Sequence, residues 1–347
     1  IKDKYGRNKE VLRIFVKHGA PREILYDYKP HIGTDILKEI VRSMREEILA
    51  SGGDVRFETR VTDLLIADGR IKGLVLNGQE ELLAEHVVLA LGHSARDTFS
   101  MLLKQKIVME PKPFAIGMRV EHPQELIDQI QYHRKEGRGK YLPAAEYSFV
   151  TQANNRGVYS FCMCPGGYVV NASSEEGRLA VNGMSYSGRN STNANSAVII
   201  TITPEDYGDS KDPLSGVAFQ RKLEEKAYQI GNGKVPVERY GNFRRAVLET
   251  ELQEPEVIQD DQKKTGTSGM EDITPCIKGQ WTLAPVHEIL PDALNHAFVE
   301  GMEAFGKKIH GFNGDEVLVE GIESRTSSPV RILRTESAQS LAVEGLY

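Results

Sequence analysis

Two stretches of this sequence place glycine, hydroxyl and arginine residues in patterns that suit the binding of an anionic ligand. Residues 87–98 read VVLALGHSARDT, so that five apolar residues run directly into Gly92. Glycine lets the backbone turn tightly and approach a ligand closely. Residues 323–331 read ESRTSSPVR, and their hydroxyls and two arginines can bind an acidic group through charge-assisted hydrogen bonds. A solvated Ser/Thr turn is the alternative for this second stretch.

Two cysteines, Cys162 and Cys164, lie two positions apart in a stretch that predicts a strand, so both thiols are expected on one face. Their C-x-C spacing differs from the C-x-x-C redox motif, and no second pair completes a zinc site, so no metal site is predicted. Packing cysteines and a thiol that faces a cofactor are both open interpretations. Because alternate residues of a strand have Cα atoms near the upper limit of disulfide geometry, both thiols are expected to be reduced and unbridged.

Three polar loops supply further candidates. His31, beside Lys29, can contact an anionic group, or it is a surface histidine at the entry to a helix. The donor-rich stretch 188–196 reads GRNSTNANS and is either a ligand-facing loop or an ordinary polar hairpin loop. Its candidate substrate contacts are Arg189, Asn190 and Asn195. The basic run 133–140 fits a solvated loop better than a nucleic-acid site, which would need interleaved aromatic residues and a longer stripe.

The first hundred residues predict a helix, a small antiparallel meander and a buried strand. The helix begins at Thr34 and ends at the glycine pair 52–53. After the helix, short strands are predicted at 55–57, 61–67, 71–76 and 80–84. Tight Asp-Gly and Asn-Gly turns join the last three strands. The apolar run 87–91 predicts a central parallel strand that ends at Gly92, where open α/β sheets hold their cofactors. Ser94 is the predicted N-cap of the helix that follows.

The rest of the chain predicts an antiparallel block with helices around it. The predicted strands are 114–120, 147–151, 158–163, 168–172, 179–185, 197–203 and 317–322. The predicted helices are 123–131, 215–231 and 291–309. An acidic connector is expected at 249–261, followed by a flexible stretch at 265–269.

Composition narrows the class of protein. A chain of 347 residues predicts about two domains, and 40% hydrophobic with 27% charged residues is ordinary for a soluble globular protein. The net charge of −6 argues against a nucleic-acid or anionic-membrane binder. Apolar runs stay well short of the ~20 residues of a membrane span, and no signal-peptide pattern is present. Three cysteines do not make a disulfide framework, which favours the cytoplasm.

Six stretches together resemble the bacterial FAD-dependent oxidoreductases of the "NAD(FAD)-utilizing dehydrogenase" family. They are KPHIGTD (29–35), ALGHSARDTF (90–99), KPFAIGMRVEHPQ (112–124), YSFCMCPGGYVVNASSEEG (159–177), NGMSYSGRNSTNANSA (182–197) and GIESRTSSPVRILR (321–334). The resemblance implies an α/β fold in which a split, Rossmann-like FAD-binding domain carries an inserted α+β domain with an antiparallel sheet. The implied boundaries are 1–109 for the first part, 110–314 for the insert and 315–347 for the return part.

The same resemblance implies hydride transfer at the flavin of FAD, with the insert covering a small-molecule substrate. NAD(P) is possible, although no motif supports it. The implied cofactor-binding residues are Val61, Ala90, Gly92, His93, Arg325, Thr326, Ser327 and Ser328. The 325–331 loop is therefore expected within about 15 Å of Gly92 and His93, a cofactor-sized distance. No residue identifies itself as a general base, and the weak catalytic candidates are His31, Cys162, Cys164 and Arg331.

Two other functions stay open: a flavoprotein of RNA modification, and a non-catalytic binding fragment without bound flavin. The glycine-rich phosphate turn and the flavin-side glycine turn of the resembled family are both missing. The nearest G-x-G patterns, at 137–139 and 231–233, do not follow predicted strands. Since each lost charge-assisted hydrogen bond is worth about 1.5–3 kcal/mol, this chain alone is expected to be inactive and to bind FAD weakly. The oligomeric state is not predicted.

Overall fold

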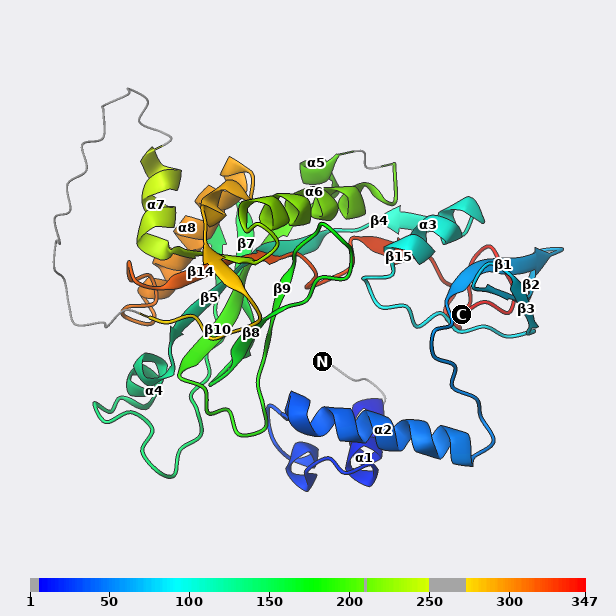
Figure 1. Ribbon diagram of the computed structural model, residues 1–347, viewed down its shortest axis with the longest axis horizontal. Coiled ribbons are helices and arrows are strands. Elements are labelled where there is room, and N and C mark those ends of the chain that lie inside the picture. Colours follow the sequence, from blue (N-terminus) through cyan, green and yellow to red (C-terminus); the bar gives the residue numbers. More distant parts are fainter. Residues whose placement is uncertain (1–5, 209–210, 250–272) are drawn as a thin grey trace.

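The computed structural model describes residues 6–208, 211–249 and 273–347 (Figure 1). All but the first residue of the predicted connector at 249–261, and the whole stretch 265–269, lie outside the described residues. The architecture is mixed α/β, and its largest sheet has seven strands in the order β13-β11-β14-β5-β10-β7-β6. The bounds of these strands are β5 Phe114–Pro123, β6 Val150–Ala153, β7 Arg156–Cys164, β10 Asn193–Ile202, β11 Val235–Arg239, β13 Trp281–Leu283 and β14 Leu318–Glu323.

The centre of the seven-stranded sheet is the antiparallel pair β5 and β10, which stays in register from Phe114 opposite Ile202 to Pro123 opposite Asn193. Alternation along β5 places Met118 and its apolar neighbours on one face and Arg119 on the other. Helices pack on the apolar face to form the main core, as Figure 1 shows. These helices include α6 (Ser215–Ile230), α7 (Tyr240–Glu249) and α8 (Asp292–Gly306).

The polar face of the same sheet is covered by a second, three-stranded sheet with the order β12-β8-β9. Its strands are β8 Tyr168–Asn171, β9 Val181–Met184 and β12 Ile277–Lys278. The remaining elements of this part are α4 Gln124–Tyr132, α5 Pro204–Tyr207 and the 3-10 helix η2 Val286–Glu288. The predicted antiparallel block and its three helices are thus present with small shifts of their bounds.

The N-terminal region contains helices and a separate small sheet. Its elements are α1 Arg7–Lys17, the 3-10 helix η1 Arg22–Leu25, α2 Thr34–Ala50, β1 Val61–Ala67, β2 Arg70–Leu76 and β3 Glu80–Leu83. The two predicted hairpins are confirmed: φ is 51° and 73° at Asp68 and Gly69, and 52° and 75° at Asn77 and Gly78. The predicted strand at 55–57 is wrong, because this segment pairs with none of the strands that the structure describes and Phe57 is exposed.

The predicted central strand at 87–91 is also wrong. Among the described residues its backbone pairs on one side only, through Val87 and Leu89, with the last three residues of the chain. Val88 is 74% exposed, so this face of the apolar run is open to solvent. Gly92 does turn the chain, with φ of 65°. The next helix, α3 (Arg96–Lys104), has Ala95 rather than Ser94 at its N-cap, because the Ser94 side chain faces Arg325 instead.

Two short strands, β4 (Met109–Pro111) and β15 (Val330–Ile332), connect the early and late parts of the chain by pairing with each other. Strand β14, which the sequence assigned to the return part, lies instead between β11 and β5 of the seven-stranded sheet. The division into 1–109, 110–314 and 315–347 stays a prediction. None of the described helices is long and apolar enough to cross a membrane.

Candidate functional site

The loop after Gly92 and the loop 325–331 lie side by side. Nη1 of Arg325 is 3.4 Å from Oγ of Ser94, although 231 positions separate the two residues. Gly92 and the end of the second loop, Val330 and Arg331, also line one groove of about 290 Å³. The predicted proximity of these loops is therefore confirmed.

The groove has apolar walls and an open glycine at its rim. Leu89, Leu91 and Phe99 line it from one loop and helix α3, and Val330 lines it from β15. No atom lies within 4 Å of the position that a Cβ of Gly92 would take, so the backbone there borders open space. A volume of about 290 Å³ is at the lower limit of small-ligand pockets, which suits one ring system rather than a whole dinucleotide.

Two buried polar atoms, one on each of the two loops, have no hydrogen-bond partner within the described part of the chain: Nε2 of His93 and Oγ1 of Thr326. Burial and the charges of Arg325 and Arg96 lower the pKa of His93, so its imidazole is neutral at pH 7 and carries one N–H donor. Since buried polar groups in native proteins are nearly always paired, these two atoms fit a ligand with donors and acceptors along its edge. The edge of a flavin ring has that chemistry.

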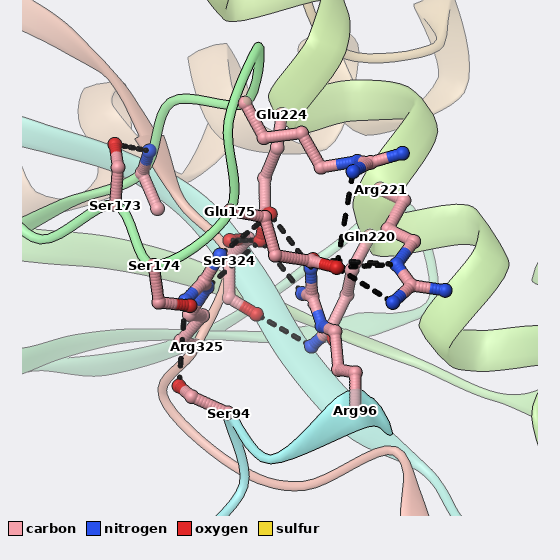
Figure 2. Close-up of polar contacts among 12 residues, drawn as sticks. Ser94, Arg96, Ser173, Ser174, Glu175, Gln220, Arg221, Glu224, Ser324 and Arg325 are labelled. Carbon is pink, nitrogen blue, oxygen red and sulfur yellow. Dashed lines mark hydrogen bonds and ion pairs between the residues drawn. The ribbon is translucent and has the colours of Figure 1, made fainter. Parts of the chain in front are cut away.

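A buried network of charges holds the two loops against the main body (Figure 2). Glu224 of α6 is fully buried and accepts hydrogen bonds from Arg96 of α3, at 2.8 Å and 2.8 Å, and from Arg325, at 3.0 Å and 2.8 Å. Glu175, from the loop between β8 and β9, binds Arg96 at 2.6 Å and Arg221 at 2.6 Å. Four segments distant in sequence are thus joined at one point.

This network changes the interpretation of Arg325. Its guanidinium binds Glu224, Ser174 and Ser94, so its charge is matched within the chain and it fixes its own loop. Arg331 is an exposed residue that pairs with Glu110 at 2.9 Å on the rim of the groove. A flavin contact by either arginine stays a prediction.

Sequence reasoning missed Arg96, Glu175 and Glu224. Arg96 and Glu175 lie in stretches that carry the family resemblance, but no motif gives any of the three a role, and their partners are far away in the chain. One signal was present: the buried stripe of α6 reads Val217, Gln220, Glu224 and Ala227, at helical spacing. Polar residues within an otherwise buried stripe require buried partners, so this stripe pointed to a polar network.

The charge network predicts an acid-dependent loss of stability. Burial favours the neutral acid, but Arg221 and Arg96 outweigh it and lower the pKa of Glu175 from 4.5 to about 2. Because the folded pKa lies below the unfolded one, this stabilisation is complete above pH 4.5 and is lost as the pH falls toward 2. In urea unfolding series over this range, Glu175→Gln is expected to show a shallower pH dependence than the wild type. Glu176→Gln, on the same loop but exposed, is the control and should keep the wild-type slope.

The remaining cofactor candidates are scattered. Val61 lines a separate hollow of about 400 Å³ between β1 and α3. Ala90 is exposed, and the hydroxyl of Ser328 is bonded within its own turn to Val330. The structure shows no contact that gives Ser327 a role. The structure brings together the two loops that carry most of the eight predicted cofactor residues, whereas Val61 lies apart from them.

The substrate candidates divide into two places. Nε2 of His31 is 3.2 Å from the carbonyl oxygen of Tyr186, and burial lowers the pKa of its imidazole. Arg189 lies near His31 and pairs with Glu146 at 2.7 Å. Asn195 was predicted to lie in that loop, but it does not. Strand β10 already begins at Asn193, and Asn195 is buried against Arg119. Asn190 stays in the loop.

The prediction that Cys162 and Cys164 share one face of a regular strand is wrong, because the strand is irregular at Cys162, although the two thiols still lie in contact. Cys162 has a left-handed backbone with φ of 46°, which re-aims its side chain. It is exposed, whereas Cys164 is buried, and both are free thiols.

Comparison with known proteins gives one family match and one extended relative. The model of the family described as "FAD-dependent protein, C-terminal domain-like" matches residues 113–326. A protein of Clostridium beijerinckii (strain ATCC 51743 / NCIMB 8052), described as uncharacterized, is 43% identical over 341 residues, which is 97% of this chain and 60% of the relative. The chain therefore spans somewhat less than two thirds of that relative.

Solved structures give only distant likenesses. Native FqzB shares 18% identity over 48% of this chain and 30% of its own, with a TM-score of 0.25. CtdE in complex with FAD shares 12% identity over 89% of this chain and 52% of its own, with a TM-score of 0.29. Scores this low carry no argument about the site.

Proposed function

Because this chain belongs to the family of FAD-dependent proteins described by that C-terminal domain, with FAD as the cofactor, we propose that it is part of a flavoprotein oxidoreductase of the dehydrogenase type. In this proposal a hydride passes between FAD and a small-molecule substrate. The observation that carries it is the pair of unpartnered buried atoms, one on each of the two loops that the fold brings together.

The proposal includes a split FAD-binding domain. Three pairings support it: β4 with β15, Arg70 with Glu344, and Val87 with Leu346. The early and late parts of the chain also share one apolar core, which contains Leu64, Val87, Phe99, Leu102, Val330, Val343 and Leu346. Pairing and a common core are what two parts of one domain require.

The residues that would hold the flavin are those around the groove. FAD supplies the hydride chemistry when it is bound. The neutral imidazole of His93 and the hydroxyl of Thr326 would orient the ring edge by hydrogen bonding. Leu89, Leu91 and Phe99 would exclude water from the ring face. Burial, with Arg325 and Arg96, lowers the pKa of His93 and keeps its imidazole neutral, which is the form that carries one N–H donor.

Replacement of Thr326 by valine tests the proposal through binding rather than turnover. Purified chain is titrated with FAD to millimolar concentration, and quenching of flavin fluorescence is followed. Because the sequence lacks a glycine-rich phosphate turn in the right context, the wild type is expected to bind more weakly than the low micromolar range. Loss of one neutral hydrogen bond should weaken binding by roughly two- to twelve-fold in Thr326→Val.

The matched control is Thr151→Val, which makes the same change on the edge strand β6. It is expected to bind FAD as the wild type does. Equal affinities for Thr326→Val and the wild type, or no saturable quenching at all, would contradict the assignment of the groove.

A further inference from the structure

Strand β7 carries a bulge where its two cysteines lie. The pairing of β7 with β10 shifts register between Asn195 and Ala197, opposite the stretch from Phe161 to Cys164. The left-handed φ of Cys162 falls in this stretch. As a result Cys162 is exposed, while the thiol of Cys164 lies beneath it and 3.3 Å from its carbonyl oxygen.

A fully buried arginine lies directly behind the two thiols. Nη1 of Arg119 is 3.2 Å from the carbonyl oxygen of Cys162 and 3.9 Å from Sγ of Cys164. Its Nε binds Glu323 at 3.0 Å. Nη2 has no hydrogen-bond partner among the described residues. A buried cation with one unused donor favours a negative charge nearby.

We propose that Cys162 is a nucleophilic thiolate that peroxides oxidise, and that Cys164 is the thiol that resolves the oxidised form as a disulfide. This redox site lies on β7 and uses Arg119 to stabilise the anion. It does not depend on the proposed flavin function, because its residues lie outside the groove.

The reaction is balanced with hydrogen peroxide as the oxidant. The Cys162 thiolate attacks one oxygen, the O–O bond breaks, and the departing hydroxide takes a proton to become water. Cys162 is then a sulfenic acid, oxidised by two electrons. The Cys164 sulfur attacks the Cys162 sulfur, the S–O bond breaks, and a second water leaves with the Cys164 proton. One peroxide and two thiols yield one disulfide and two waters.

The charge environment favours the assignment of Cys162 as the attacking thiol. The groups that face the pair are Cys164 on β7, Arg119 on β5 and Glu323 on β14. A hydrogen bond from the Cys164 thiol, together with Arg119, lowers the pKa of Cys162 to about 6, while the same contact and burial raise the pKa of Cys164.

Alkylation of the unmodified chain is the first test. Iodoacetamide labelling at pH 6 is followed by mass spectrometry of each cysteine peptide. Because the pKa of Cys162 is lowered, a larger fraction of it than of an ordinary thiol is thiolate at pH 6, and it should react roughly ten-fold faster even after its lower intrinsic nucleophilicity. Cys276, which is partly exposed, is the internal reference. Equal rates for Cys162 and Cys276 would overturn the proposal.

Peroxide treatment of three variants is the second test. Wild type and Cys276→Ser are expected to form the Cys162–Cys164 disulfide. Cys164→Ser should stop at a sulfenic acid on residue 162 that dimedone labels, and Cys162→Ser should give neither product. Circular dichroism checks that each variant is folded. If dimedone does not label the Cys164→Ser protein, or if the Cys276→Ser protein does not form the disulfide, the resolving role is misassigned.

Discussion

Replacing Glu224 with alanine is expected to lower the free energy of unfolding by about 3–5 kcal/mol, which is the usual cost of removing one partner from a buried ion pair. Glu224 is fully buried, and so is Arg96, whose side chain is 1% exposed. Without the carboxylate, Arg96 keeps Glu175, but Arg325 loses its counter-charge in a site that is 8% exposed. A typical domain has only about 5–15 kcal/mol of stability, so the loss should be large.

The neighbouring residue Glu225 is a matched control. It lies on the same helix and pairs with Arg178 at 2.7 Å, but 47% of its side chain is exposed. Exposed ion pairs contribute about 0–1 kcal/mol, so Glu225→Ala should unfold near the wild-type urea midpoint. The measurement is urea unfolding at pH 7 followed by circular dichroism. If Glu224→Ala differs from Glu225→Ala by less than about 1 kcal/mol, the network does not hold the loops.

The second large effect is expected for Gly183→Ala on β9. A Cβ at this position would lie 1.8 Å from Nη1 of Arg119 and 2.5 Å from Oδ1 of Asn195. Arg119 cannot move aside freely, because it is fully buried and bound to Glu323, Asn195 and the carbonyl of Cys162. Overpacking alone costs about 1–3 kcal/mol, and displacement of a buried charge adds to it. We therefore expect a loss of at least 3 kcal/mol.

Gly188→Ala makes the same chemical change where there is room. The nearest atoms to its Cβ position belong to Asn190, at 3.7 Å, which is an ordinary contact. Its unfolding midpoint in urea should match or slightly exceed that of the wild type. A Gly183→Ala protein as stable as Gly188→Ala would show that β9 does not pack as closely on Arg119 as the structure describes.

Local sequence signals were sufficient for much of the fold. Asp68-Gly69 and Asn77-Gly78 specify their hairpins, because only a few residues accept two successive positive φ angles. The period of two along β5 and of 3.6 along α6 indicated their type and their apolar face. The two candidate loops were also identified from sequence, since glycine, hydroxyl and arginine clusters keep their chemistry wherever the fold places them.

Other features depend on contacts that no local pattern specifies. The run Val87–Leu91 is apolar enough for a central strand, but a strand becomes central only when partners lie on both sides. Within the described part of the chain its one partner is the segment 345–347. The C-x-C spacing predicts two thiols on one face of a regular strand, but the bulge at Cys162 exposes that residue and leaves Cys164 buried in contact with it.

By itself, then, the sequence determined the helices, the hairpins, the antiparallel block and the residue types of the two loops, because propensity and periodicity act between neighbours. Only the tertiary structure decided that Glu224 meets Arg96 across 128 positions, that Arg325 is matched within the chain, and that Arg119 lies behind Cys162. A buried charge is stable only beside its partner, and the identity of that partner depends on how distant segments pack.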